Sequence, residues 1–258
     1  MVAPRIVVHV PHASVVIPDD VRASFLLGDD DLERELVAMT DGYTDEIFAL
    51  PREIATTVRF PVSRLVVDPE RFADDAGEPM SSKGMGVVYT TTSDGRPLRS
   101  APPPNDRARL LARFYEPHHA ALERAVAAAL EVHGACAVVD AHSFPSRALP
   151  YEDDQRDDRP EICIGTDAFH TPKGLRDLAV ATFRTRGFSV DVDRPFAGAL
   201  VPMTFYRRDA RVQALMIEIN RALYMDERTG DRLDSFAVIQ RRIQDAVDAI
   251  IQAVTPKL

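Results

Sequence analysis

Short apolar runs alternate along the chain with longer segments in which apolar residues recur every three or four positions. Short runs rich in β-branched side chains are typical of buried strands, and the longer recurrence is typical of amphipathic helices. Strands are therefore predicted at 6–10, 54–60, 64–68, 86–92, 135–140, 162–165, 188–192 and 213–219. Helices are predicted at 29–50, from a cap at 105 or 106 to about 133, at 171–186 and at 232–254.

This alternation of strands and helices indicates an α/β protein with a mixed, mostly parallel sheet and helices on both faces. A chain of 258 residues is long enough to bury a sizeable core. No internal repeat or linker divides the sequence. We therefore expect residues 1–258 to form a single domain.

The net charge of the chain argues against two classes of binding partner. The formal net charge is −9 and no basic block is present, so nucleic acid and anionic membranes are poor candidates. The sequence has no run of eighteen apolar residues and no signal-peptide pattern at its start, so we expect no membrane span and a cytoplasmic location. Cys136 and Cys163 both stand in apolar runs, which predicts two buried thiols rather than a zinc motif.

The stretch 5–18, RIVVHVPHASVVIP, contains the first candidate for chemistry. Pro11 cannot donate a hydrogen bond to a sheet ladder, so the strand is expected to end there. His12 then stands just beyond a strand end, where ligands bind in open α/β sheets. His9 lies inside the strand and is predicted to face the opposite side. We interpret His12 as the functional histidine and His9 as structural.

Two further polar groups are weaker signals. Asp41 and Asp45 are four residues apart and would share one face of the predicted helix, where a solvated acidic surface is the ordinary explanation. Arg64 and Arg71 stand at the two ends of a predicted strand. Arginine suits bidentate binding of a carboxylate, although surface arginines are common.

Two acidic groups stand at or within apolar strands. Asp140 and His142 follow the predicted strand 135–140 and would point to the same side. A carboxylate beside a histidine orients a metal-bound imidazole, but a hydrogen-bonded structural histidine fits equally well. Glu218 lies in an apolar run, where burial would raise its pKa and suit it to general acid–base catalysis. The alternative is a structural ion pair with Arg221.

Two histidines and one aspartate with an open coordination position would make a plausible catalytic zinc set. The sequence contains no HExxH, GxSxG, GxGxxG or P-loop motif. A serine triad and a nucleotide-binding loop therefore have little support.

Seven motifs, taken in order, resemble the N-formylglutamate amidohydrolase family between residues 5 and about 227. They are VPHAS, TDGYTDEIF, SRLVVDPERF, GVVYTTTSDGRPLR, YEPHHAAL, VVDAHSF and LMIEINRALYMDE. The resemblance implies a zinc-carboxypeptidase-like and aspartoacylase-like fold. It also implies metal-dependent hydrolysis of the amide of an N-acyl amino acid. The named reaction converts N-formyl-L-glutamate and water to glutamate and formate, the last step of one histidine degradation route.

The resemblance assigns a metal set to matching positions. His12 and His142 match the family's histidines and are expected to bind zinc, Zn2+. Asp41 matches the acidic position of the TD motif and is expected to be the third ligand. Asp45 is the alternative for that third position.

The resemblance also assigns the remaining site residues. Glu218 resembles the glutamate that activates the attacking water. Arg64 resembles the arginine near the scissile carbonyl, and Arg71 resembles the arginine that holds the substrate carboxylate. His119 matches a recurrent family histidine and is a candidate to support the site or to contact substrate. A histidine on the helix surface is the alternative for His119, and this alternative fits His118 better.

The sequence departs from the family pattern at two points. The usual DLNR is DPER here, so Glu70 replaces an asparagine and adds negative charge near the expected carboxylate site. The usual PHSG is PHAS, without the glycine. Glu70 favours an alternative, a zinc hydrolase or peptidase acting on another N-acyl amino acid or small peptide. A non-catalytic binding protein on the same fold is a second alternative, opposed by the presence of His12, Asp41, His142 and Glu218.

Overall fold

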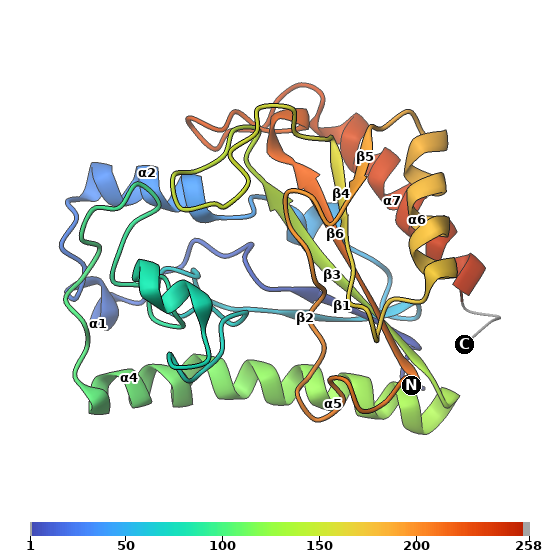
Figure 1. Cartoon of the computed structure of the whole chain (residues 1–258), viewed down its shortest axis with the longest axis horizontal. Helices are drawn as coiled ribbons and strands as arrows, with labels where there is room; N and C mark the ends of the chain where they lie inside the picture. Colours follow the sequence, from blue (N-terminus) through green and yellow to red (C-terminus); the bar gives the residue numbers. More distant parts are fainter. Residues whose placement is uncertain (1, 255–258) are drawn as a thin grey trace.

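The computed structural model describes residues 2–254. A six-stranded sheet has the strand order β2-β1-β3-β6-β4-β5. Neighbouring strands are parallel except β4, which pairs antiparallel with β6. This confirms the prediction of a mixed, mostly parallel sheet (Figure 1). The strands are β1 (Ile6–Val10), β2 (Ala55–Arg59), β3 (Cys136–Phe144), β4 (Ile162–Gly165), β5 (Val190–Val192) and β6 (Val212–Asn220).

Helices cover both faces of this sheet, as predicted (Figure 1). They are α1 (Asp19–Arg22), α2 (Asp29–Met39), α3 (Thr44–Ile47), α4 (Pro104–Leu110), α5 (Glu116–His133), α6 (Lys173–Thr185) and α7 (Phe236–Val254). Short turns of helix are η1 (Pro79–Lys83), η2 (Leu111–Tyr115) and η3 (Arg221–Leu223).

Strand alternation divides the core between the two faces. On one face, Ile6 and Val8 of β1 pack in the cluster that contains the apolar stripe of α7. On the other face, Val7 packs with Leu122 and Val126 of α5. The sheet is therefore an inner layer between α5 on one side and the α6–α7 pair on the other.

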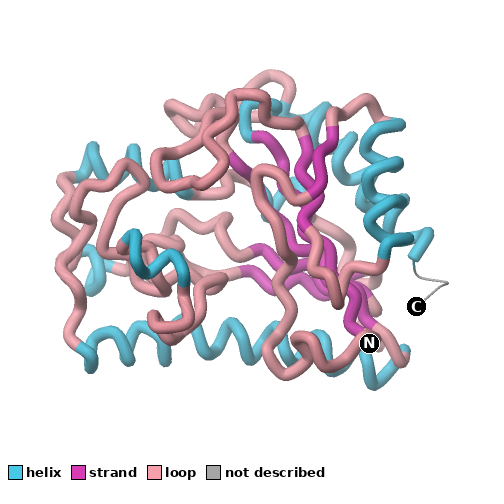
Figure 2. The backbone as a smooth tube through the Cα atoms, in the orientation of Figure 1, coloured by secondary structure: helices cyan, strands magenta, loops and turns pink. Residues whose placement is uncertain are grey.

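A third buried cluster lies outside the sheet, in the loop-rich end of the molecule (Figure 2). The segment 60–98, which we call the loop region, contributes most of its members. The predicted strands 64–68 and 86–92 fall here and are wrong, because both segments form turns and bends. Leu65, Val66 and Val67 are all fully buried although they are consecutive, which a one-sided strand would not allow.

The predicted helix 29–50 is interrupted. It ends at Met39, and a new helical turn, α3, begins only at Thr44. Between them the backbone N–H of Asp41 donates to the carbonyl of His12, and Tyr43 has a positive φ of 63°. These contacts take Asp41 off the helix face that it was expected to share with Asp45.

The helix predicted to end near 133 is confirmed, and it begins at Pro104. The π-helical turn η2 interrupts it between α4 and α5. Pro117 lies just after this turn and lacks the N–H that would bond to the preceding turn, which accounts for the local change of pitch.

Two smaller expectations are settled by the fold. The strand predicted at 135–140 extends to Phe144, so Asp140 and His142 lie within β3 and not after it. Cys136 and Cys163 are buried free thiols, as predicted. Within residues 2–254, no helix combines the length and apolar character that a bilayer span requires.

Candidate active site

The candidate site lies at the carboxyl ends of β1, β3 and β6, on the face of the sheet that α5 covers. His142 and Glu218 are direct neighbours in the register of β3 and β6. Asp140 is two residues before His142 in β3 and therefore shares its face, as predicted. The sheet register alone thus brings an imidazole and two carboxylates together.

His12 has one ring nitrogen held and the other without a partner. Its Nε2–H donates to Asp68 Oδ1 at 2.9 Å, and its buried Nδ1 makes no hydrogen bond. Asp68 is itself fixed by Arg64 Nη2 at 2.8 Å and by the Tyr89 hydroxyl at 2.5 Å. A carboxylate that holds one nitrogen and leaves a lone pair on the other is the arrangement found behind metal-binding histidines.

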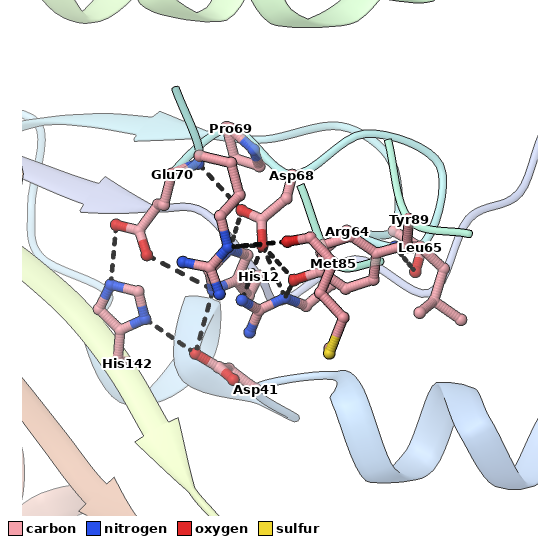
Figure 3. A network of polar contacts seen from close by, with 12 residues as sticks. His12, Asp41, Arg64, Leu65, Asp68, Pro69, Glu70, Met85, Tyr89 and His142 are labelled. Carbon is pink, nitrogen blue, oxygen red and sulfur yellow. Dashed lines mark hydrogen bonds and ion pairs between the residues drawn. The ribbon is translucent and has the colours of Figure 1, made fainter. Parts of the chain in front are cut away.

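His142 lies between the carboxylates of Asp41 and Glu70 (Figure 3). Its Nδ1 is 3.1 Å from Asp41 Oδ2, and its Nε2 is 3.1 Å from both Glu70 Oε1 and Asp140 Oδ1. Burial alone would lower the pKa of His142, but the charges of Glu70 and Asp140 raise it well above its usual value. The carboxylates around His142 therefore stabilise positive charge at this position.

Asp41 is held from two sides. Its Oδ1 accepts from Arg221 Nη2 at 2.8 Å, and its Oδ2 lies 3.1 Å from His142 Nδ1 and 3.7 Å from His12 Nδ1. Burial would raise the pKa of Asp41, but its interactions with the two histidines and the charge of Arg221 lower it well below its usual value. Asp45 instead pairs with Arg59 at 2.8 Å, away from the cavity.

Glu70 is the second carboxylate close to both histidines. Among the described residues, two groups bring three ligand atoms within 4.8 Å of one another: His12, Glu70 and His142 in one, His9, Glu70 and Asp140 in the other. Asp41 belongs to neither group, although its Oδ2 is close to both Nδ1 atoms. Two carboxylates, Asp41 and Glu70, therefore compete for a third coordination position.

Glu218 is buried, and its Oε2 has no hydrogen-bond partner. Desolvation raises the pKa of Glu218 to about 8, with the His142 charge acting in the opposite direction. The predicted alternative, a structural ion pair with Arg221, is not seen among the described residues, because Arg221 pairs with Asp41. A carboxyl group with a raised pKa in a cavity is suited to moving protons.

The two predicted arginines come from the loop region and not from the ends of a strand. The Arg64 guanidinium is tied to Asp68 at 2.8 Å. The Arg71 guanidinium is less engaged: its Nε donates to the Met85 carbonyl at 3.3 Å and lies 3.9 Å from Asp68. Arg71 is thus the more available partner for a carboxylate ligand.

Most of the predicted site residues line one cavity of about 160 Å³, which we call the catalytic cavity. Those that line it are His12, Asp41, Arg64, Arg71, His142 and Glu218. His119 lies outside its lining: its Nε2–H donates to the Pro69 carbonyl at 2.8 Å, so it supports the chain segment next to Glu70. Burial lowers the pKa of His119.

The prediction that His9 faces away from His12 is wrong, because each has its Nδ1 3.8 Å from an oxygen of Glu70. The chain turns at Pro11, so strand alternation does not extend to His12. His9 Nδ1–H donates to Asp140 at 2.8 Å, and its Nε2 lies 2.8 Å from that of His118. His118 is therefore buried beneath the site and not on the helix surface where it was expected.

Sequence reasoning gave no role to Asp68, Tyr89 or Arg221 in holding the site. Asp68 is 56 residues from His12, and Arg221 is 180 residues from Asp41. One signal was present for Asp68: it is acidic within the otherwise apolar segment LVVDP, as Glu218 is within its own apolar run.

The family model described as N-formylglutamate amidohydrolase matches residues 4–225. The crystal structure of N-formylglutamate amidohydrolase from Ralstonia eutropha JMP134 is 26% identical, with a TM-score of 0.87 over 99% of this chain and 96% of that chain. The gene product Atu2144 from Agrobacterium tumefaciens is 20% identical, with a TM-score of 0.64 over 96% and 92%, and shares the fold. No curated protein matches the sequence.

Proposed function

This chain belongs to the N-formylglutamate amidohydrolase family, and we propose that it hydrolyses the amide of an N-acyl amino acid, with N-formyl-L-glutamate as the first substrate to test. The observation that supports this most strongly is that one cavity is lined both by His12, which has a free, buried Nδ1, and by Glu218, a buried glutamate whose pKa is raised. In the histidine degradation route, the same reaction would release glutamate and formate.

We propose further that the site holds one divalent metal ion, zinc in the first instance. The orphaned Nδ1 of His12 points to this, and so does the enclosure of His142 by carboxylates. Imidazole and carboxylate ligands with an open position suit zinc, although related divalent ions accept the same ligands. When bound there, the ion would polarise the acyl carbonyl and make water more acidic.

Asp41 is our choice for the third ligand, because its Oδ2 faces the Nδ1 atoms of both histidines. Glu70 is the competing choice, because it belongs to the compact group with both histidines. A matched pair of variants, Asp41→Asn and Glu70→Gln, distinguishes them by zinc content at equal protein concentration. Loss of zinc from the first variant alone supports Asp41, and loss from the second alone assigns the position to Glu70.

The chain's own residues account for substrate orientation. The Arg71 guanidinium is available for the carboxylate of the amino acid, and Arg64 lies in the same cavity for the carbonyl oxygen. A donor aimed at the developing oxyanion is typically worth about 3–4 kcal/mol of barrier. Asp68 fixes both Arg64 and His12, so it aligns the group that meets the oxygen with the group that would hold the ion.

Glu218 carries the protons. As a carboxylate, it takes a proton from water while the water oxygen attacks the acyl carbon. It then delivers that proton to the amide nitrogen, and the carbon–nitrogen bond breaks. The products are a free amine and a carboxylic acid, formate in the case of the formyl group. The burial that raises the Glu218 pKa makes it a competent acid in the second step.

The test is release of formate from N-formyl-L-glutamate by purified protein, with zinc added and with a chelator. Release that requires zinc and stops with the chelator supports the proposal. Protein that carries stoichiometric zinc and releases no formate would discard this substrate. Protein that takes up no zinc, and hydrolyses nothing, would favour the non-catalytic alternative.

A further inference from the structure

A second cavity, of about 370 Å³, adjoins the catalytic cavity of about 160 Å³. We call it the side cavity. The two share four lining residues, namely Glu70, Arg71, Ala197 and Met216. A molecule bound in the catalytic cavity therefore lies next to the side cavity.

The lining of the side cavity is mainly apolar. Its side chains come from the loop after Arg71, from η2 and the start of α5, and from the segment 197–206. They include Phe72, Tyr115, Leu200, Val201, Met203 and Tyr206. Phe72 and Met203 are 49% and 59% exposed, which is unusual for large apolar side chains and places them at the rim. A concave apolar surface of this size is typical of a small-molecule site.

The charged groups in this lining do not suit a carboxylate. Glu70 and Asp140 are acidic, and Arg71 is the one cation among the described lining residues, apart from His119. His119 is committed to the Pro69 carbonyl, and burial lowers its pKa, so it stays neutral near pH 7. A second carboxylate placed here would lack a cationic partner, which is costly to bury.

The other two arginines near the catalytic cavity are already paired. Arg64 pairs with Asp68 and Arg221 pairs with Asp41, each at 2.8 Å. Arg71 is left to bind one carboxylate. An N-acylglutamate brings two, one on the α-carbon and one on its side chain.

Arg71 lines both cavities. The substrate group that binds Arg71 therefore sets which other part of the substrate lies at the side cavity. If Arg71 binds the α-carboxylate, then the side chain on the same carbon atom lies next to the side cavity. The acyl carbonyl lies at the histidines, on the other side of the scissile bond.

We infer that the side cavity receives the side chain of the substrate amino acid, and that the preferred substrates are N-acyl derivatives of amino acids with large apolar side chains, such as phenylalanine or leucine. This inference rests on the proposed amidohydrolase function. It differs from it by excluding glutamate as the preferred side chain.

The experiment compares kcat/KM for formate release from four substrates by zinc-loaded protein: the N-formyl derivatives of L-phenylalanine, L-glutamate, L-glutamine and glycine. We expect phenylalanine to exceed both glycine and glutamate by about 10-fold or more. Glutamine should exceed glutamate, because it has nearly the same shape without the charge. Hydrolysis in which glutamate equals or exceeds phenylalanine overturns the inference and leaves the amidohydrolase function intact.

Two further arms complete the test. N-hexanoylglycine puts the apolar group on the acyl side and is hydrolysed to hexanoate and glycine, so this arm compares release of the free amino acid. N-hexanoylglycine should be a poorer substrate than N-formyl-L-phenylalanine, and the reverse order would assign the side cavity to the acyl group and overturn the inference. Calorimetric binding of L-phenylalanine and L-glutamate to the same protein needs no turnover. Tighter binding of L-phenylalanine supports the inference even if no formate is released, a result that would by itself discard the formyl group as the acyl group.

A variant at the rim makes the test specific to the side cavity. Met203→Lys puts a cation at the rim of the side cavity. It should raise kcat/KM for N-formyl-L-glutamate relative to N-formyl-L-phenylalanine by about 10-fold. Val238→Lys is the matched control, because Val238 is 61% exposed on α7 and does not line either cavity. An equal shift in both variants, or none in Met203→Lys, contradicts the assignment of the side chain to this cavity.

Discussion

The sheet and the loop region contribute to the same site by different physical means. The sheet supplies His142, Glu218 and Asp140, whose positions follow from the register of β3 and β6. The loop region supplies Asp68 and Glu70, which lie in a segment without strands. In the sheet, backbone hydrogen bonds fix each side chain independently. In the loop region, side chains fix one another.

This difference predicts how substitutions behave. Removing a strand residue should delete one function and leave its neighbours in place. Removing Asp68 should disturb several groups together, because it accepts hydrogen bonds from His12, Arg64 and Tyr89. On this account, the sheet supplies the proposed metal-binding and proton-transfer groups. The loop region holds His12 and Arg64 in position beside them.

The largest effect is expected at His142. His142→Ala should abolish zinc binding and hydrolysis together, since it removes one of the two proposed histidine ligands while β3 keeps its register. Zinc content by mass spectrometry and formate release are the two measurements. His133→Ala, at the far end of α5, is the control. An active variant with full zinc content would refute the ligand assignment.

The next effect is expected at Glu218. Glu218→Gln should keep the zinc and lose about 10²–10⁴-fold in kcat, the usual contribution of a general acid–base. Zinc content and kcat are measured on the same preparation, with the exposed Glu131→Gln on α5 as the matched control. Turnover that survives the change would require another base.

An intermediate effect is expected in the loop region. Asp68→Asn should weaken zinc binding by about 10–100-fold, the typical loss when the group behind a ligand histidine is changed. It should also lower kcat, because Arg64 loses its ion-pair partner. A zinc titration measures the first effect and formate release the second. Asp157→Asn, in an exposed loop, is the control. Loss of zinc affinity with kcat unchanged would show that Asp68 serves His12 alone.

The smallest effect is on the stability of zinc-free protein. The ordinary pKa of Glu218 is 4.5, and burial raises it to about 8 in the folded state. Between these values the unfolded chain releases the proton and the folded chain keeps it, so this group makes folding less favourable as the pH rises through that window. Glu218→Gln should therefore be more stable than the parent at pH 8, by at least about 1 kcal/mol.

The same variant gives the matching control for that prediction. Near pH 4.5 most of the pH-dependent difference between variant and parent should be gone, because Glu218 is then protonated in the folded protein and already half protonated in the unfolded chain. Denaturant unfolding at the two pH values measures this. A difference that does not change with pH would show that the Glu218 pKa is not raised in the folded protein.

Sequence reasoning was most successful for the sheet. The apolar runs predicted β1, β3 and β6, because a strand buried on both faces is a local pattern of side chains. The same pattern predicted that Asp140 and His142 would share a side. It misread 64–68 and 86–92, because an apolar run buried in the loop region has the same composition as a strand.

Site residues that stand at strand ends could be predicted from the sequence. Site residues whose positions depend on long-range contacts could not. Asp41 and Asp45 were equivalent on a helix, and only the break after Met39 separates them. Asp68 meets His12 across 56 residues, which no spacing indicates. Glu70 stood out in sequence as a departure from the family pattern, and in the structure it contacts His142 and lies between the two cavities.

The most direct test of the account is anomalous diffraction at the zinc edge from crystals of the zinc-loaded protein. The account predicts one strong peak within coordination distance of His12 Nδ1 and a ring nitrogen of His142, with Asp41 or Glu70 as the third ligand and Glu218 facing it. A fully occupied peak elsewhere, or an empty site in protein that hydrolyses N-formyl amino acids, would contradict it.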